Sequence, residues 1–352
     1  MADNKKMVTI EEVIDEVTRI YEAGESRDNL KDILHLDILL NALKVKRDEL
    51  GTLDLKVISR ALSEVRYAAR VFKPYRQARK VSIFGSARTP EDDPRYQMAV
   101  EFARQLADNG YMVITGAAEG IMKAGNVGAG KEMSFGVNIL LPGEQAPNEI
   151  VADDPKLITF KYFFTRKLFF LMEAHAVVLF PGGFGTQDEG FETLTLVQTG
   201  KAPPMPLILM ELPGDDYWVN WDRFVRGQML GRGLISEEDV SLYRICNTPE
   251  EGIEWVKSYY STYHSMRLVH RKLVVRLQKE LTDEHVELLN DEFSEIVDKG
   301  RIKKTAMLPE EANEPEIAGL PRLVFNYNQM NAARLNSMFL RINEMGKTVQ
   351  GT

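Results

Sequence analysis

The stretch 176–189, AVVLFPGGFGTQDE, joins an apolar run to a glycine-rich turn and then to the start of a helix. Residues 177–180 form the short continuous apolar run that is typical of a parallel strand covered on both faces. Pro181 ends the run, and the glycines after it let a ligand approach the backbone closely. Thr186 stands where the hydroxyl of a helix N-cap belongs. Unpaired amides and the positive end of a helix dipole would make this turn a phosphate site.

The middle of the chain alternates short apolar strands with helices. Strands are expected at 81–84, 111–115, 135–141, 176–180 and 206–210, and helices at 96–109, 121–129, 166–175 and 186–200. This alternation predicts an α/β fold with a doubly wound parallel sheet of the Rossmann-like kind. Because ligands bind at the carboxyl ends of such strands, the three glycine turns that follow strands should meet in space.

Three domains are expected along the chain. Residues 1–77, with helices near 9–21, 30–43 and 55–72, form a helical N-terminal extension that we assign to packing and oligomerisation. Residues 78–262 form the Rossmann-like nucleotide-binding domain. Residues 263–352 form a small C-terminal α+β domain, with strands expected at 268–277, 301–306 and 323–327 and helices at 283–298 and 331–344.

Four ordered motifs lie within roughly residues 80–260. They are the pair Arg166-Lys167, the turn PGGFGT that leads to Glu189, the segment VSIFGSAR at 81–88 and the loop TGAAEGIM at 115–122. Together these motifs resemble the LOG (LONELY GUY) family of nucleoside 5′-monophosphate phosphoribohydrolases, which are often mislabelled lysine decarboxylases. The resemblance implies hydrolysis of the N-glycosidic bond of a nucleoside 5′-monophosphate, such as AMP or a cytokinin riboside monophosphate, to a free base and ribose 5-phosphate. It also implies a homodimer or a higher homo-oligomer.

Two catalytic residues follow from this resemblance. The glycosidic bond breaks through a cationic sugar, so the site needs negative charge near the ribose and a positioned water. We assign this role to Glu189 and expect the helix start to keep it ionised. Arg166 would hold a phosphate or the base and assist the departure of the base. The alternative for Glu189 is a capping box with Thr186.

The remaining candidates would bind the phosphate and the ribose. They are Gly85, Ser86, Gly116, Gly120, Lys167, Gly182, Gly183, Gly185, Thr186 and Glu192. Asp188 is expected to face solvent.

The second glycine loop departs from the family pattern. The family reads Thr-Gly-Gly-Gly-Pro-Gly, whereas this chain has Ala117, Ala118 and Glu119 at the third to fifth positions. The carboxylate of Glu119 would repel a bound phosphate unless it points away or pairs with a cation such as Arg88. The alternative function is therefore a non-catalytic nucleotide-binding or molybdenum-cofactor-type carrier, or a regulatory protein.

Composition and motifs argue against several other kinds of site and partner. The five histidines are scattered and the single cysteine, Cys246, has no partner, so no metal site is expected. The turn after the first strand lacks Gly-x-Gly-x-x-Gly, and we expect no cofactor. The net charge of -8 argues against a nucleic-acid partner. No apolar run is long enough to span a bilayer, so we expect no membrane partner and a cytoplasmic location.

Overall fold

The computed structural model describes residues 11–12, 15, 18–19, 30–141 and 146–348. The chain divides into two compact units, 1–63 and 64–352. The first unit contains helix α2 (Leu30–Arg47) and the first part of helix α3 (Thr52–Phe72), as expected. The helix expected near 9–21 lies largely outside the described residues. The three-domain division of the sequence stays a prediction.

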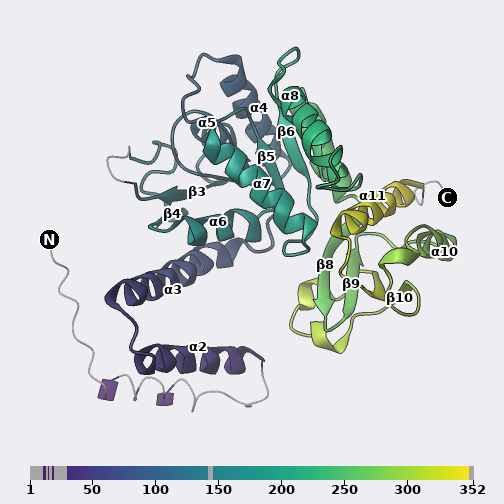
Figure 1. Cartoon of the computed structure of the whole chain (residues 1–352), viewed down its shortest axis with the longest axis horizontal. Coiled ribbons are helices and arrows are strands. Elements are labelled where there is room, and N and C mark those ends of the chain that lie inside the picture. Colours follow the sequence, from purple (N-terminus) through teal and green to yellow (C-terminus); the bar gives the residue numbers. More distant parts are fainter. Residues whose placement is uncertain (1–10, 13–14, 16–17, 20–29, 142–145, 349–352) are drawn as a thin grey trace. The chain divides into compact units, whose positions relative to one another are not determined.

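A parallel sheet of seven strands forms the centre of the second unit (Figure 1). Its strands are β1 (Lys80–Phe84), β2 (Met112–Thr115), β3 (Ser134–Ile139), β4 (Leu157–Phe160), β5 (Ala176–Leu179), β6 (Leu207–Met210) and β7 (Tyr243–Cys246). The order is β4-β3-β2-β1-β5-β6-β7, and every neighbouring pair is parallel. The predicted doubly wound α/β fold is confirmed. The strand order reverses between β1 and β5, which is where such sheets bind ligands.

Helices cover both faces of this sheet. One core packs α4 (Pro94–Asp108), α5 (Ile121–Ala129) and α9 (Pro249–Tyr259) on the sheet. The opposite core contains the end of α3 with α6 (Phe163–Met172), α7 (Phe184–Gln198) and α8 (Tyr217–Phe224). On β5, Val177 belongs to one core and Val178 to the other. This arrangement explains why the strand reads as an unbroken apolar run.

Both edge strands, β4 and β7, were missing from the sequence prediction. Each exposes part of its length, so neither has the continuous apolar run that marked the central strands. Helices α8 and α9 were also not predicted. Cys246 ends β7 and is fully buried, and burial raises the pKa of its thiol to about 11.

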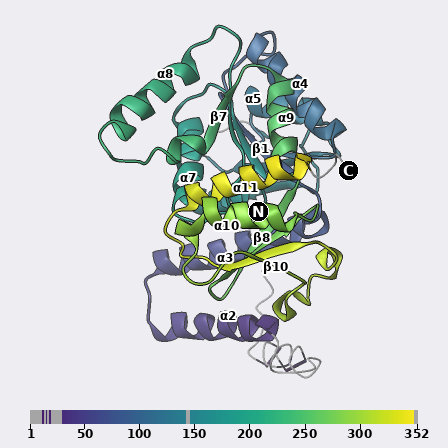
Figure 2. The same ribbon diagram turned by 90° about the vertical axis from the view of Figure 1, so that its right-hand side faces the viewer.

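A second sheet, of four antiparallel strands, lies in the C-terminal part (Figure 2). Its strands β8 (Tyr263–Val269), β9 (Lys272–Leu277), β10 (Lys303–Thr305) and β11 (Arg322–Asn326) have the order β10-β11-β9-β8, accompanied by α10 (Asp283–Glu292) and α11 (Ala332–Thr348). The single strand predicted at 268–277 is wrong. The chain turns there at His270, whose φ is 55°, and makes a hairpin.

Shorter helical segments connect these elements. They are the 3-10 turns Lys73–Tyr75, Asp239–Ser241, Ser294–Ile296, Pro309–Glu311 and Pro315–Ile317, and the π-helical turn Val225–Leu230.

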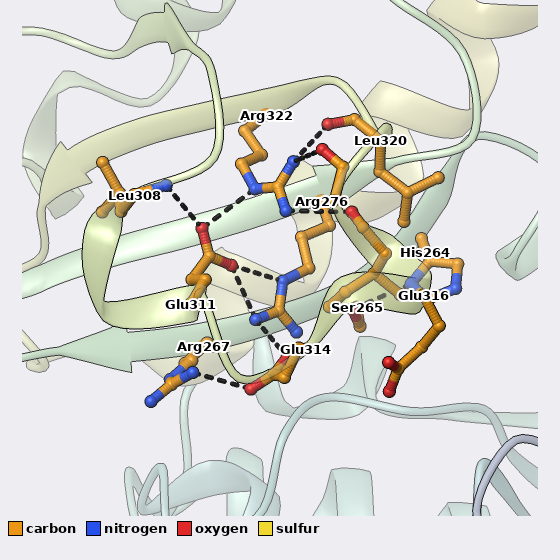
Figure 3. A network of polar contacts seen from close by, with 12 residues as sticks. His264, Ser265, Arg267, Arg276, Leu308, Glu311, Glu314, Glu316, Leu320 and Arg322 are labelled. Carbon is orange, nitrogen blue, oxygen red and sulfur yellow. Dashed lines mark hydrogen bonds and ion pairs between the residues drawn. The ribbon is translucent and has the colours of Figure 1, made fainter. Parts of the chain in front are cut away.

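A buried ion network fixes the loop between β10 and β11 (Figure 3). Glu311 is fully buried, and its carboxylate accepts from Arg276 Nε at 2.8 Å and from Arg322 Nε at 2.9 Å. Arg276 Nη2 also lies 2.7 Å from Glu314 Oε2. Burial alone would raise the pKa of Glu311, but the Leu308 amide and the two arginines outweigh burial and lower it.

Candidate active site

Three glycine turns meet at the carboxyl ends of β1, β2 and β5. Ser86 N, after β1, donates to Pro181 O, after β5, at 3.2 Å. Ile121 N, at the end of the second loop, donates to Ser86 O at 3.0 Å. A Cβ on Gly120 would lie 2.3 Å from Ser86 O, so the two loops approach more closely than a side chain allows. The predicted convergence of the turns is confirmed.

Helix α7 begins earlier than the sequence suggested. Its N-cap is Gly183, and Thr186 lies buried in the first turn, so the prediction of Thr186 as N-cap is wrong. The capping box of Thr186 with Glu189 is wrong for the same reason. The first helical hydrogen bond runs from Gln187 N to Gly183 O at 3.2 Å. The amides of residues 184–186 therefore precede the ladder and are the donors that a helix start offers to an anion.

A cavity of about 660 Å³ opens at this point, and we call it the glycine-loop cavity. Its wall includes eight of the predicted site residues: Gly85, Ser86, Gly116, Arg166, Gly183, Gly185, Thr186 and Glu189. The wall also includes residues that the sequence reasoning did not select, among them Arg88, Met122, Asn138, Phe163 and Phe170. Phe163 and Phe170 are two of the many apolar residues of α6. The sequence does not distinguish the apolar residues that line the cavity from those that lie in the core.

Glu189 is the buried carboxylate of the cavity. Its side chain comes from α7, the residue is 7% exposed, and its Oε2 atom has no hydrogen-bond partner within the described part of the chain. Burial raises its pKa to about 7, although Lys167 and Arg166 act in the opposite direction. The expectation that the helix start keeps Glu189 ionised is met only in part, because a carboxyl with a pKa of about 7 is partly protonated at neutral pH. Desolvation outweighs the favourable charges.

Hydrogen bonds hold the guanidinium of Arg166 against the second glycine loop. Its Nε donates to Val137 O at 2.9 Å, and its Nη2 reaches Gly116 O at 3.4 Å. The guanidinium carbon lies 5.0 Å from the centre of the Phe170 ring. A Cβ at Gly116 would lie 2.6 Å from Nη2, so the loop needs glycine there to make room for the arginine. These contacts place a fixed positive charge on the cavity wall.

Four predicted site residues lie outside the cavity wall. Lys167 Nζ is 2.9 Å from both Asp188 Oδ1 and Glu192 Oε2, and these ion pairs outweigh burial and raise the pKa of the lysine. Gly182 accepts a hydrogen bond from Tyr217 at 2.6 Å through its carbonyl, and Gly120 serves the packing of the loops. Lys167 and Glu192 therefore tie α6 to α7. Asp188 is mostly exposed, as expected, yet it also borders the cavity.

Glu119 is paired, but its partner is Lys123 and not Arg88. Lys123 Nζ lies 3.7 Å from Glu119 Oε2, and it also binds Glu91 at 2.8 Å and Glu149 at 3.1 Å. Glu119 does not belong to the cavity wall. Lys123 offsets only part of the charge of Glu119, because it also pairs with Glu91 and Glu149 at shorter distances.

One of the two alanines of the second loop, Ala117, has a backbone conformation that favours glycine. Ala117 has a φ of 63°, in the left-handed region. Asn148 holds the loop through two hydrogen bonds. Its backbone N donates to Ala117 O at 2.9 Å, and its side-chain Nδ2 donates to Ala118 O at 3.1 Å. These hydrogen bonds fix the second glycine loop to Asn148.

Two features are absent from the described residues, a metal-binding cluster and a membrane-spanning helix. No group of three or more His, Cys, Asp and Glu side chains is placed there to hold a metal ion. No helix in that part of the chain is both long and apolar enough to cross a membrane.

Comparison with known proteins finds one family model that matches part of the chain and several solved structures that are similar to it. Residues 115–256 match the family model described as "Possible lysine decarboxylase". The chain is similar to the molybdenum-cofactor carrier protein of Chlamydomonas reinhardtii, at 21% identity over 51% of this chain and 96% of that one, with a TM-score of 0.37. It is also similar to the molybdenum-cofactor binding protein of Rippkaea orientalis, at 21% identity over 51% and 94% of the two chains, with a TM-score of 0.37. DNA processing protein A of Helicobacter pylori matches at 14% identity over 51% and 81%, with a TM-score of 0.36. No curated protein sequence matches the chain.

Proposed function

We propose that this protein is a nucleoside 5′-monophosphate phosphoribohydrolase, because residues 115–256 match the model of the family described as "Possible lysine decarboxylase", the label under which LOG-type proteins are often found. The observation that carries the proposal is the carboxylate of Glu189 on the wall of the glycine-loop cavity. This carboxylate is buried, and its Oε2 atom has no hydrogen-bond partner in the described part of the chain. The reaction would convert a nucleoside 5′-monophosphate and water into a free base and ribose 5-phosphate.

The start of α7 would bind the 5′-phosphate. The amides of residues 184–186 precede the helical hydrogen bonds, and Thr186 adds a hydroxyl in the same turn. A Cβ at Gly183 or Gly185 would contact nothing within 4 Å, so the space above these two glycines is open to a ligand. Arg88 at the same cavity supplies a positive charge.

Glu189 would then act on the sugar. In its ionised form it stabilises the cationic ribose and takes a proton from the attacking water. The water gives its hydroxyl to C1′, and the base leaves with the electrons of the C1′–N bond and takes a proton from solvent. A pKa of about 7 suits this role, because a general base works best when its pKa lies near the working pH.

Arg166 would assist the leaving group. Its guanidinium is fixed by Val137 O and Gly116 O on the wall of the same cavity as Glu189. A positive charge held there favours the electron density that builds up on the departing base. The apolar side chains of Met122, Ile139 and Phe163 offer the base a surface for stacking and packing.

The test is a panel of nucleoside 5′-monophosphates, comprising AMP, GMP, CMP, UMP and N6-prenylated AMP, with free base and ribose 5-phosphate measured. We expect release from at least one of them, and a loss of about 10²- to 10⁴-fold in Glu189→Gln. Asp188→Asn is the matched variant, since it neutralises the adjacent, mostly exposed carboxylate, and its loss should stay below about tenfold. Saturable nucleotide binding without release from any member would reject the enzyme and favour the carrier function.

We also propose that the protein is a homo-oligomer of the cytoplasm. Helix α2 exposes seven leucine and isoleucine side chains, namely Ile33, Leu34, Leu36, Ile38, Leu39, Leu40 and Leu43. Apolar surface of this kind is typical of contacts between proteins. Light scattering coupled to size-exclusion chromatography would give the mass, and a mass equal to that of one chain would reject the oligomer.

A further inference from the structure

A second cavity, of about 630 Å³, lies where the α/β part meets the first strand of the C-terminal sheet. We call it the junction cavity. Four segments of the chain line it. They are residues 76–79 before β1, the end of α6, residues 196–205 at and after the end of α7, and residues 260–266 at the start of β8. It shares no lining residue with the glycine-loop cavity.

The charges of the junction cavity have one sign. Its lining includes Arg76, Arg79 and Lys201 but no aspartate or glutamate. None of these three cations forms an ion pair with a residue in the described ranges. Two carboxylates lie close to lining residues without being part of the wall: Glu316 accepts a hydrogen bond from Gln77 Nε2 at 3.0 Å, and Glu173 pairs with Lys80 at 3.3 Å.

Arg79 is the centre of this charge. Its guanidinium carbon lies 3.7 Å from the centre of the Tyr260 ring, and its Nη2 donates to His264 O at 3.5 Å. Its Nη1 is buried without a hydrogen-bond partner in the described chain. Burial lowers the pKa of His264 to about 4, and the positive charges of Arg79 and Arg276 act in the same direction. A buried guanidinium nitrogen without a partner is costly unless an acceptor arrives.

The rest of the lining is apolar or aromatic. Met172, Leu196, Met205 and Met266 line the cavity together with Tyr260 and Tyr263. Tyr260 is fixed by its hydroxyl, which donates to His175 O at 2.6 Å. A few positive groups within a mostly apolar wall are the usual composition of a small-molecule site.

We propose that the junction cavity binds a small organic anion, with a carboxylate or phosphate headgroup on Arg76, Arg79 and Lys201 and an apolar or aromatic body against the methionines and tyrosines. The site is distinct from the phosphate cradle at the start of α7, and binding there does not depend on the proposed hydrolase activity.

The occupant of this cavity would act on the glycine-loop cavity through two shared helices. Leu168, Leu171 and Met172 line the junction cavity on α6, the helix that carries Arg166. Leu196 lines it on α7, the helix that carries Glu189. An anion that shifts either helix end therefore changes the positions of the two proposed catalytic groups. This regulatory consequence rests on the proposed function.

Calorimetric titration tests the site with phenylacetate and phenyl phosphate as probes, which separate the two headgroups. Inorganic phosphate and benzyl alcohol provide the headgroup alone and the ring alone. At least one aromatic anion should bind more tightly than either part, and Arg79→Gln should weaken that binding by about tenfold or more. Lys201→Gln changes an exposed side chain, so it should lower affinity without harm to the fold. Arg88→Gln, in the glycine-loop cavity, should leave that binding in place.

Absence of saturable binding by both anions would overturn the proposal. So would binding that is lost in Arg88→Gln and retained in Arg79→Gln and Lys201→Gln. The regulatory step has its own readout, the rate of base release with and without the bound anion. A change in rate that disappears in Lys201→Gln supports coupling, and an unchanged rate with the anion bound rejects coupling while the binding site stands.

Discussion

Glu189 connects the burial of one side chain to a measurable pH dependence. Its carboxylate has a pKa raised to about 7 by burial, so below that pH it is mostly protonated and above it mostly ionised. If the ionised form acts on the ribose and the water, kcat/KM rises as the pH increases through about 7 and then levels off. Steady-state rates from pH 5 to pH 9 would measure this limb. A residual rate in Glu189→Gln should lack it, and an identical limb in that variant would assign the titration to another group.

Two glycines of the site predict opposite effects of the same substitution. Gly120→Ala should destabilise the fold by about 1–3 kcal/mol, because φ is 65° and the new Cβ would lie 2.3 Å from Ser86 O. Gly183→Ala should keep the stability, since its Cβ would contact nothing within 4 Å, but it should weaken phosphate binding by occupying the open space. Thermal unfolding and ribose 5-phosphate titration would separate the two. Equal stability of the two variants would contradict the assignment.

The sequence was most informative where backbone demands leave a mark in residue type. Proline, the three glycines and the threonine of residues 181–186 predicted a turn between a strand and a helix, and the structure has this turn between β5 and α7 on the wall of the glycine-loop cavity. Burial of a single side chain leaves no such mark. The raised pKa of Glu189 depends on its burial in the packed molecule. The pairing of Glu119 with Lys123 depends on how the second glycine loop enters α5.

At the scale of elements, one carboxylate from α3 holds the start of α6. Glu64 is buried, and its two oxygens accept from Lys161 N and from Thr165 Oγ1, both at 2.7 Å. A negative charge at a helix N-terminus is favourable, and α6 has no side-chain cap of its own. This contact therefore fixes the helix that carries Arg166.

Glu64→Ala should lower the free energy of unfolding by about 1.5–3 kcal/mol for each charged hydrogen bond that is not replaced by water. It should also slow base release, because the position of Arg166 depends on α6. Urea unfolding and the nucleotide assay would measure both effects, with the exposed Glu132→Ala as control. A loss of stability equal in the two variants would argue against this role of Glu64.

Secondary structure was predictable where burial is uniform and not where it alternates. The central strands β1, β2, β5 and β6 are buried along their whole length, and each was predicted from its apolar run. The edge strands β4 and β7 expose some residues and were missed. The hairpin of β8 and β9 was read as one strand because its turn at His270 and Arg271 lacks glycine, proline and asparagine.

For the molecule as a whole, the C-terminal sheet depends on a charge that is buried between two arginines. Glu311→Gln leaves Arg276 and Arg322 without their shared counter-charge and should destabilise the protein by about 3–5 kcal/mol. Thermal unfolding followed by circular dichroism would measure this loss, with the exposed neighbour Glu310→Gln as the matched control.

The same comparison has an expected pH dependence. The pKa of Glu311 in the folded protein is below the ordinary value of 4.5, so its stabilising effect is complete above pH 4.5 and is lost as the pH falls through the folded pKa. The difference between wild type and Glu311→Gln should therefore shrink in acid. A difference that stays constant down to low pH would exclude the ion pairs as its source.

Because Cys246 is buried, we expect the folded protein to react very little with thiol reagents. It is the only cysteine, it is fully buried, and burial raises its pKa to about 11, so little thiolate is present at neutral pH. A cysteine introduced at Phe184, which is 96% exposed beside the glycine-loop cavity, would then accept a fluorescent dye at one defined point. The emission of that dye could follow ligand arrival in real time without removal of a native residue elsewhere.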